Sequence, residues 1–196
     1  VLASCSKDKT IILWDPEKRE QIRVLRGHSG QVICVVFSFE GNTLVSCSND
    51  NTIKVWDVAS GKELKSLKQH KDEVCCLAFL PIGMLASGGK DRKVFLWDSA
   101  EWRVAHTLEQ TQAVHSLVAH FESFNLYIGC QDSKINVWEI DQGVLSSSRV
   151  CEYKFSHSLP KKITGVRAKG TVIQNSKISK ADENIFKSKG ASVKDN

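Results

Sequence analysis

The sequence predicts an all-β fold made of repeated four-stranded units, and three observations support this prediction. A tryptophan followed by an acidic residue recurs four times, at steps of 42, 41 and 41 residues. Each of these tryptophans lies six residues after an aspartate, and the apolar runs between them are short and bounded by turn residues. A fixed period of this length indicates stacked copies of one supersecondary unit. The tryptophan pairs are Trp14-Asp15, Trp56-Asp57, Trp97-Asp98 and Trp138-Glu139, and the upstream aspartates are Asp8, Asp50, Asp91 and Asp132.

The first unit, residues 1–27, is expected to be incomplete. The chain begins at Val1 with residues typical of the middle of a strand, and no basic segment followed by an apolar stretch marks a signal peptide. We therefore expect the chain to be a piece of a longer protein. No apolar run approaches the ~18 residues that a membrane-spanning helix needs, so a membrane partner is not expected.

The second unit, about residues 28–68, illustrates the plan of each repeat. Its first apolar run is continuous, as is typical of a strand covered on both faces, and a later run alternates with period two. Glycine, asparagine and aspartate separate the runs and indicate turns. The expected strands are 32–38, 44–48, 52–56 and 63–67, with turns at 40–42, 49–51 and 60–61.

Two further complete units are expected at about 70–109 and 113–156, which extends the repeat region to residue 157. The remaining residues, 158–196, are interpreted as a basic tail or a degenerate further unit. Lys, Ser and Asn dominate there and large apolar residues are few, which favours disorder. The alternative is a unit beginning near 162–166, with strands at Val172-Ile173 and Ile185-Phe186.

Charge is unevenly distributed along the chain. Residues 1–142 carry 16 Lys and Arg against 18 Asp and Glu, whereas residues 143–196 carry 11 against 4. A basic tail can attract nucleic acid or acidic partners, but this one lacks interleaved aromatic residues, so nucleic acid is not expected as a partner. The basic residues considered were Lys161, Lys162, Arg167 and Lys169.

The seven cysteines do not indicate a disulfide framework or a zinc site. Their number is odd, no C-x-x-C spacing occurs, and most lie in apolar strand-like runs, where a free thiol behaves as a small hydrophobe. This usage suits the cytoplasm or the nucleus. His115 and His120 are five residues apart and would not share one face of a strand, so neither a metal nor a cofactor is expected.

The in-register Asp-x5-Trp pairs, together with Gly27-His28 and His70, resemble the WD40-repeat family. The resemblance implies a β-propeller, in which four-stranded blades pack radially around a channel. This chain would supply a partial propeller of about three complete blades plus incomplete end blades. Because an open stack exposes apolar faces at its ends, we expect a fragment, or a form that misfolds alone or borrows blades from a second copy.

The resemblance also implies a hydrogen-bonded tetrad of histidine, serine, aspartate and tryptophan in each regular blade. A buried Trp N–H needs an acceptor, a serine hydroxyl can accept it and bond to the histidine, and the carboxylate accepts from the histidine. In the fourth unit, Thr111 stands where histidine is expected and Ile128 where serine is expected, so we expect that blade to be the least rigid. The tetrads are His28, Ser46, Asp50 and Trp56, and His70, Ser87, Asp91 and Trp97.

A catalytic Ser-His-Asp triad is the alternative interpretation of these residues, and it is rejected. Catalysis needs one exposed nucleophile and an oxyanion hole rather than the same set in successive repeats, and no G-x-S-x-G motif is present. The chain is therefore predicted not to be an enzyme.

The resemblance implies a protein-interaction scaffold or adaptor that binds peptides or domains on the top face of a propeller, within a multiprotein complex. Family members use the position before the tetrad aspartate and the start of each inner strand. The alternative for any single one of these positions, and the favoured one, is an ordinary solvated loop residue; the prediction concerns the set. The partner-binding candidates are Lys7, Gln31, Ile33, Asn49, Glu73, Cys75, Lys90, Ala113, His115 and Gln131.

The alternative function is a substrate-recognition or regulatory module of a larger enzyme complex, such as a ubiquitin ligase or a multidomain ATPase. Some ubiquitin-ligase receptors of the family carry arginine two residues after Trp-Asp. The corresponding positions here, which give that route no support, are Glu17, Ala59, Ala100 and Asp141.

Overall fold

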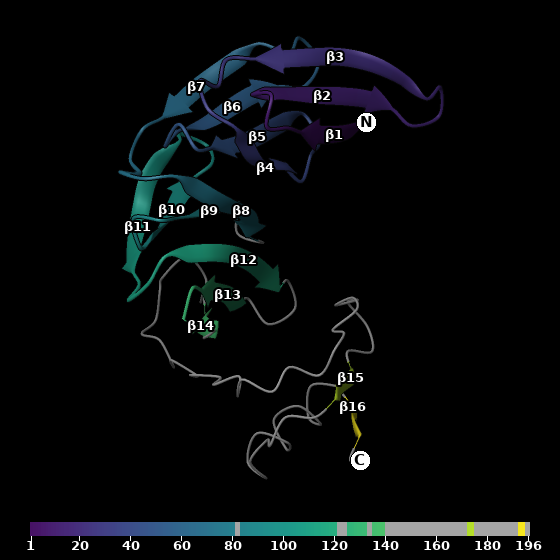
Figure 1. Cartoon of the computed structure of the whole chain (residues 1–196). Helices are drawn as coiled ribbons and strands as arrows, with labels where there is room; N and C mark the ends of the chain where they lie inside the picture. Colours follow the sequence, from purple (N-terminus) through teal and green to yellow (C-terminus); the bar gives the residue numbers. More distant parts are fainter. Residues whose placement is uncertain (81–82, 121–124, 133–134, 140–171, 175–191, 195–196) are drawn as a thin grey trace. The chain divides into compact units, whose positions relative to one another are not determined.

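The chain forms a succession of short β-strands in the computed structural model (Figure 1). The structure describes residues 1–80, 83–120, 125–132, 135–139, 172–174 and 192–194. The chain divides into two units, Val1–Tyr153 and Lys154–Asn196. Among these described residues, no helix is long and apolar enough to cross a membrane.

The first unit contains four antiparallel sheets, in each of which the strands lie in chain order. The outer two sheets of this series have three described strands and the middle two have four. The prediction of an all-β fold is therefore confirmed. The strands are β1 (Leu2–Cys5), β2 (Thr10–Asp15) and β3 (Glu20–Arg26); β4 (Val32–Phe37), β5 (Thr43–Ser48), β6 (Ile53–Asp57) and β7 (Glu63–Leu67); β8 (Val74–Leu80), β9 (Met84–Gly89), β10 (Lys93–Asp98) and β11 (Arg103–Glu109); and β12 (Val114–His120), β13 (Asn125–Cys130) and β14 (Ile135–Glu139).

In the second sheet, residues that tolerate a left-handed backbone stand at the corners of the tight turns. Gly41 and Gly61 adopt φ values of 72° and 71°, and Asn51 adopts 65°. Glycine adopts such angles without a steric penalty, and asparagine adopts them more readily than most residues. The turns therefore lie where the sequence predicted them, at 40–42, 49–51 and 60–61.

The core consists of layers between neighbouring sheets. Trp56 of the second sheet packs against Ile11 and Leu13 of the first, and Trp97 of the third packs against Val45 and Val55 of the second. Both of these tryptophans thus face the preceding sheet. The layer between the third and fourth sheets contains Cys76, Leu80, Ala86, Val94, Leu96, Leu108, Val114, Leu117, Leu126, Ile128 and Cys130.

The first strands of neighbouring sheets lie next to one another, as the contacts of β8 with β4 and with β12 record. Each of these three strands carries a β-bulge near its start, between Val32 and Cys34, between Val74 and Cys76, and between Val114 and Ser116. A bulge inserts one unpaired residue and redirects its side chain. The extra residues are Ile33, Cys75 and His115.

In the second unit, β15 (Val172–Gln174) pairs in parallel with β16 (Ser192–Lys194). The strand predicted at Val172-Ile173 lies within β15. The strand predicted at Ile185-Phe186, the start of a further unit at 162–166 and the basic residues 161–169 all lie outside the described residues. The last part of the fourth predicted repeat, 140–156, also lies outside them.

Candidate functional site

In the second sheet, four side chains form one continuous hydrogen-bonded network. The indole Nε1 of Trp56 donates to Ser46 Oγ at 2.8 Å, and Ser46 Oγ lies 2.7 Å from His28 Nε2. His28 Nδ1 lies 2.9 Å from Asp50 Oδ2. Because an indole can only donate and a carboxylate can only accept, Nδ1 of His28 carries the proton and the serine hydroxyl donates to Nε2.

The third sheet repeats this geometry with different residues. Trp97 Nε1 donates to Ser87 Oγ at 2.8 Å, and Ser87 Oγ lies 2.9 Å from His70 Nε2. The Nδ1 atom of His70 lies 2.9 Å from Asp91 Oδ2. The two tetrads inferred from the family resemblance are therefore assembled within hydrogen-bond distance in both sheets.

The aspartate of each tetrad also holds the two loops that meet at that end of the sheet. Asp50 accepts from the backbone N–H of Ser29 at 2.8 Å and from that of Thr52 at 3.0 Å. Asp91 accepts in the same way from Lys71 at 3.0 Å and from Lys93 at 3.2 Å. One carboxylate thus joins the loop before the first strand to the turn before the third strand.

Burial and hydrogen bonding determine the charge states of the ionisable groups in the tetrad of the second sheet. Burial is the largest effect on His28 and lowers its pKa, as it does for His70. Burial also opposes ionisation of Asp50, but hydrogen bonds from Thr52, His28 and Ser29 outweigh it and hold the pKa of Asp50 well below its usual range. At neutral pH the network therefore contains neutral imidazole and aspartate carboxylate.

The first and fourth sheets keep only part of the network. In the first sheet, Trp14 Nε1 donates to Ser4 Oγ at 2.9 Å, and Ser4 is exposed. In the fourth sheet, Ile128 occupies the serine position and is fully buried.

The histidine position of the fourth sheet is occupied by Gln110 rather than Thr111, so the sequence-based assignment was wrong by one residue. His28 and His70 each lie four residues before the first strand of their sheet, and Gln110 lies four residues before β12. Gln110 Oε1 accepts from Asn136 Nδ2 at 2.7 Å. The separation between histidine and serine is 18 residues in the second sheet and 17 in the third, so it does not determine the position, whereas the separation from the strand is the same in both.

We expect backbone amides in β12 and β13 to exchange with deuterium faster than those in β4, β5, β8 and β9. The Gln110–Asn136 bond replaces only one of the buried bonds that a full tetrad supplies. Because an amide exchanges when its strand opens locally, a sheet with fewer such bonds is expected to open more often. Hydrogen exchange followed by mass spectrometry measures this difference. Equal or slower exchange in the fourth sheet would contradict the prediction.

The partner-binding candidates lie at the same end of the sheets as the tetrad aspartates, and we call this set the rim: Lys7, Gln31, Ile33, Asn49, Glu73, Cys75, Lys90, Ala113, His115 and Gln131. Within each of the second, third and fourth sheets a backbone bond joins two rim positions. The N–H of Asn49 donates to the Gln31 carbonyl at 3.0 Å, and the N–H of Lys90 donates to the Glu73 carbonyl at 2.9 Å. Gln131 and Ala113 make the same bond at 2.9 Å.

The rim residues differ in how far their side chains are available to a partner. Ile33 is 42% exposed, His115 is exposed and Cys75 is half-buried, and all three are the extra residues of bulges. Lys90 Nζ lies 2.8 Å from Glu73 Oε2, and this bond raises the pKa of Lys90. The charges of Lys90 and Glu73 are therefore engaged with each other.

Glycine is required beside the tetrad of the third sheet. A Cβ atom added to Gly89 would lie 2.8 Å from the Glu73 carbonyl oxygen and 2.9 Å from His70 Nδ1. Any side chain at position 89 would therefore push the backbone of Glu73, a rim residue, away from His70 of the tetrad.

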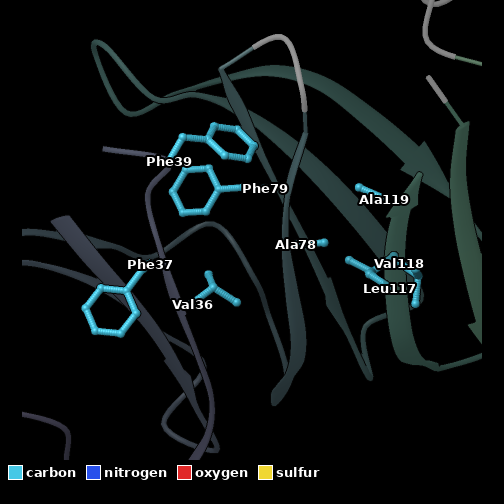
Figure 2. Close-up of a pocket in the computed structure, with 8 residues that line it drawn as sticks. All are labelled: Val36, Phe37, Phe39, Ala78, Phe79, Leu117, Val118 and Ala119. Atoms are coloured by element: carbon cyan, nitrogen blue, oxygen red, sulfur yellow. The ribbon is translucent and has the colours of Figure 1, made fainter. Parts of the chain in front are cut away.

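The sequence analysis missed an apolar hollow at the opposite ends of the first strands (Figure 2). Phe39 and Phe79 pack there with their ring centroids 5.8 Å apart, and Phe39 is 52% exposed. The signal in the sequence was the continuous apolar run 32–38, which was interpreted as a strand covered on both faces. The hollow has a volume of about 410 Å³ and is lined by Val36, Phe37, Phe39, Ala78, Phe79, Leu117, Val118 and Ala119.

Comparisons with known proteins agree with this geometry. The family model "WD domain, G-beta repeat" matches residues 1–15, 19–57 and 61–98. A solved structure described as "Structure of U3-55K" is similar to this chain with 31% sequence identity and a TM-score of 0.66. The similarity covers 70% of this chain but only 45% of that one, so this chain spans less than half the length of its structural neighbour.

A search of curated proteins found no match. Solved structures match far more widely, with 1356 chains, so the architecture alone does not select one partner or pathway. The matching family model, the solved neighbour and the sheets with their tryptophan networks agree: the chain belongs to the WD40-repeat family and forms part of a β-propeller.

Proposed function

We propose that this chain is a non-catalytic interaction scaffold that binds peptides or domains of other proteins on the rim. The WD40 propeller supports a protein-interaction role in general. The observation that supports the rim in particular is the repetition of one device in three sheets: a bulge residue at the start of the first strand beside a loop held by a backbone bond. Binding residues are commonly carried by loops on a rigid scaffold.

A non-catalytic role is supported by the burial of the two tetrad serines. Ser46 and Ser87 are both fully buried, and each hydroxyl oxygen is already bonded to an indole and an imidazole. A nucleophile has to be within reach of substrate, so these bonds stabilise the fold instead. Among the described residues, no group of His, Cys, Asp and Glu is arranged to hold a metal ion.

The rim favours a partner that combines an apolar contact with polar ones, because Ile33 on the second blade and His115 on the fourth present different chemistry on either side of the third blade. Membership of a multiprotein complex follows from such a role. A cytoplasmic or nuclear site of action is supported by the six described cysteines, all of which are free thiols.

The test uses a library of phage-displayed peptides selected on the immobilised chain, followed by affinity measurement on individual peptides. Ile33→Ser is expected to weaken rim-binding peptides about tenfold, equivalent to about 1.4 kcal/mol, because a partly exposed anchor contact is lost. His115→Ala is expected to weaken them as well.

Ile22→Ser is the matched control, since Ile22 is 47% exposed on the outer strand β3 and lies outside the rim. It is expected to leave affinity unchanged. Peptides that lose affinity equally with both isoleucine variants, or with neither, would show that the rim is not the binding surface.

A further inference from the structure

Two cysteines of the second blade face each other across neighbouring strands. Cys34 on β4 and Cys47 on β5 are direct partners in the antiparallel register. Opposite residues of such a pair point to the same face, with Cα atoms about 4.5–5.5 Å apart. That interval lies within the ~4.4–6.8 Å that a disulfide bond spans.

The two thiols differ in their access to solvent. Cys47 is fully buried in the layer between the second and third blades, beside Val45 and Ile53. Cys34 is partly exposed and packs against the same layer. Cys34 is therefore the more accessible of the two thiols to a small dissolved reagent, and the Cys47 thiol lies within hydrogen-bond reach of it.

The surroundings of Cys34 also favour its thiolate. A hydrogen bond with the Cys47 thiol outweighs the effect of burial and lowers the pKa of Cys34 to about 7, with the backbone N–H of Leu77 contributing. Burial instead raises the pKa of the other partly exposed thiols, Cys5 and Cys75. Thiolate character and access together determine which cysteine is oxidised first.

We propose that Cys34 and Cys47 form a reversible oxidation site, in which Cys34 reacts with hydrogen peroxide and Cys47 resolves the product into a disulfide. In the first step the Cys34 thiolate attacks one peroxide oxygen, the O–O bond breaks, and Cys34 sulfenic acid and hydroxide form. In the second step Cys47 sulfur attacks the Cys34 sulfur, its proton leaves with the hydroxyl group as water, and the S–S bond forms. A thiol reductant reverses the reaction by exchange.

Mass spectrometry of the unaltered chain tests this proposal. The reduced chain is treated with increasing hydrogen peroxide, its remaining thiols are alkylated, and it is digested. No Lys or Arg lies between the two cysteines, so trypsin leaves both in the peptide 27–54, and cleavage after Glu40 then separates them unless a disulfide joins the halves. The linked halves are expected to accumulate several-fold faster than oxidation products of Cys5 and Cys75.

Variants separate the two roles. Cys47→Ser is expected to stop at a Cys34 sulfenic acid that dimedone traps, whereas Cys34→Ser removes both the sulfenic acid and the linked peptide. Cys75→Ser is the matched control and is expected to leave the linked peptide unchanged. The proposal is overturned if Cys34 in the unaltered chain is oxidised no faster than Cys5 and Cys75, or if its disulfide partner is a cysteine other than Cys47.

Discussion

Replacing Ser46 by alanine is expected to lower the free energy of unfolding by about 3 kcal/mol, because two buried polar groups lose their partner at once. The serine oxygen accepts from Trp56 Nε1 at 2.8 Å and contacts His28 Nε2 at 2.7 Å. Both of these side chains are buried, so water cannot replace the lost bonds without the blades separating. Chemical denaturation followed by tryptophan fluorescence measures the change.

Ser66→Ala is the matched control for this prediction. Ser66 lies on β7 of the same blade, and its side-chain oxygen is buried without a hydrogen-bond partner. Its replacement is therefore expected to change stability by less than about 0.5 kcal/mol, or to raise it. If Ser46→Ala were no more destabilising than Ser66→Ala, the tetrad would not contribute to the stability of the blade.

Replacing Asp50 by asparagine is expected to lower the free energy of unfolding at neutral pH by about 2 kcal/mol, because charge-assisted bonds to His28, Ser29 and Thr52 become neutral ones. The same variant is expected to flatten the dependence of stability on pH in the acid range. Denaturation series at several pH values measure both effects.

The sign of the pH dependence follows from the direction of the shift. The folded-state pKa of Asp50 lies below its ordinary value, so the unfolded chain binds the proton first as the pH falls. The contribution of Asp50 is therefore complete above the ordinary aspartate pKa of about 4 and is lost as the pH falls below it.

The buried histidines also reduce stability as the pH falls, but they do so at a higher pH than Asp50. Burial lowers the pKa of His28 and His70, so the unfolded chain gains protons below about pH 6.5 while the folded chain does not. This earlier loss of stability is expected to remain in Asp50→Asn.

Asp72→Asn is the control for the aspartate, because Asp72 is exposed and bonds the backbone of its neighbour Glu73. It is expected to leave both the stability and its acid dependence close to those of the unaltered chain. An acid profile of Asp50→Asn that is identical to that of the unaltered chain would contradict the assignment of Asp50.

Most of the fold followed from local pattern in the sequence. The period of the tryptophans and the turn residues at Gly41, Asn51 and Gly61 located the strands, because turn chemistry and side-chain alternation depend on neighbours in the chain. The fourth blade was the least regular in the sequence, and there the histidine position was assigned one residue too late, to Thr111 instead of Gln110.

The candidate site could be predicted only in part. The rim positions were named from the family resemblance, but the bulges that present Ile33, Cys75 and His115 were not predicted. A bulge depends on how one strand pairs with the next, and a shift of one residue moves a side chain to the other face. For the same reason, the ion pair of Lys90 with Glu73 could not be foreseen.

By itself, the sequence determined the repeating unit, its all-β character and the residue types of the tetrads, since these are encoded at fixed spacing along the chain. The tertiary structure alone decided which of those residues meet. It brought Cys34 opposite Cys47, joined Gln110 to Asn136 and buried Ser46 between blades. The physical reason is that register and the packing of one sheet on the next determine contacts between residues far apart in sequence, and no local spacing contains that information.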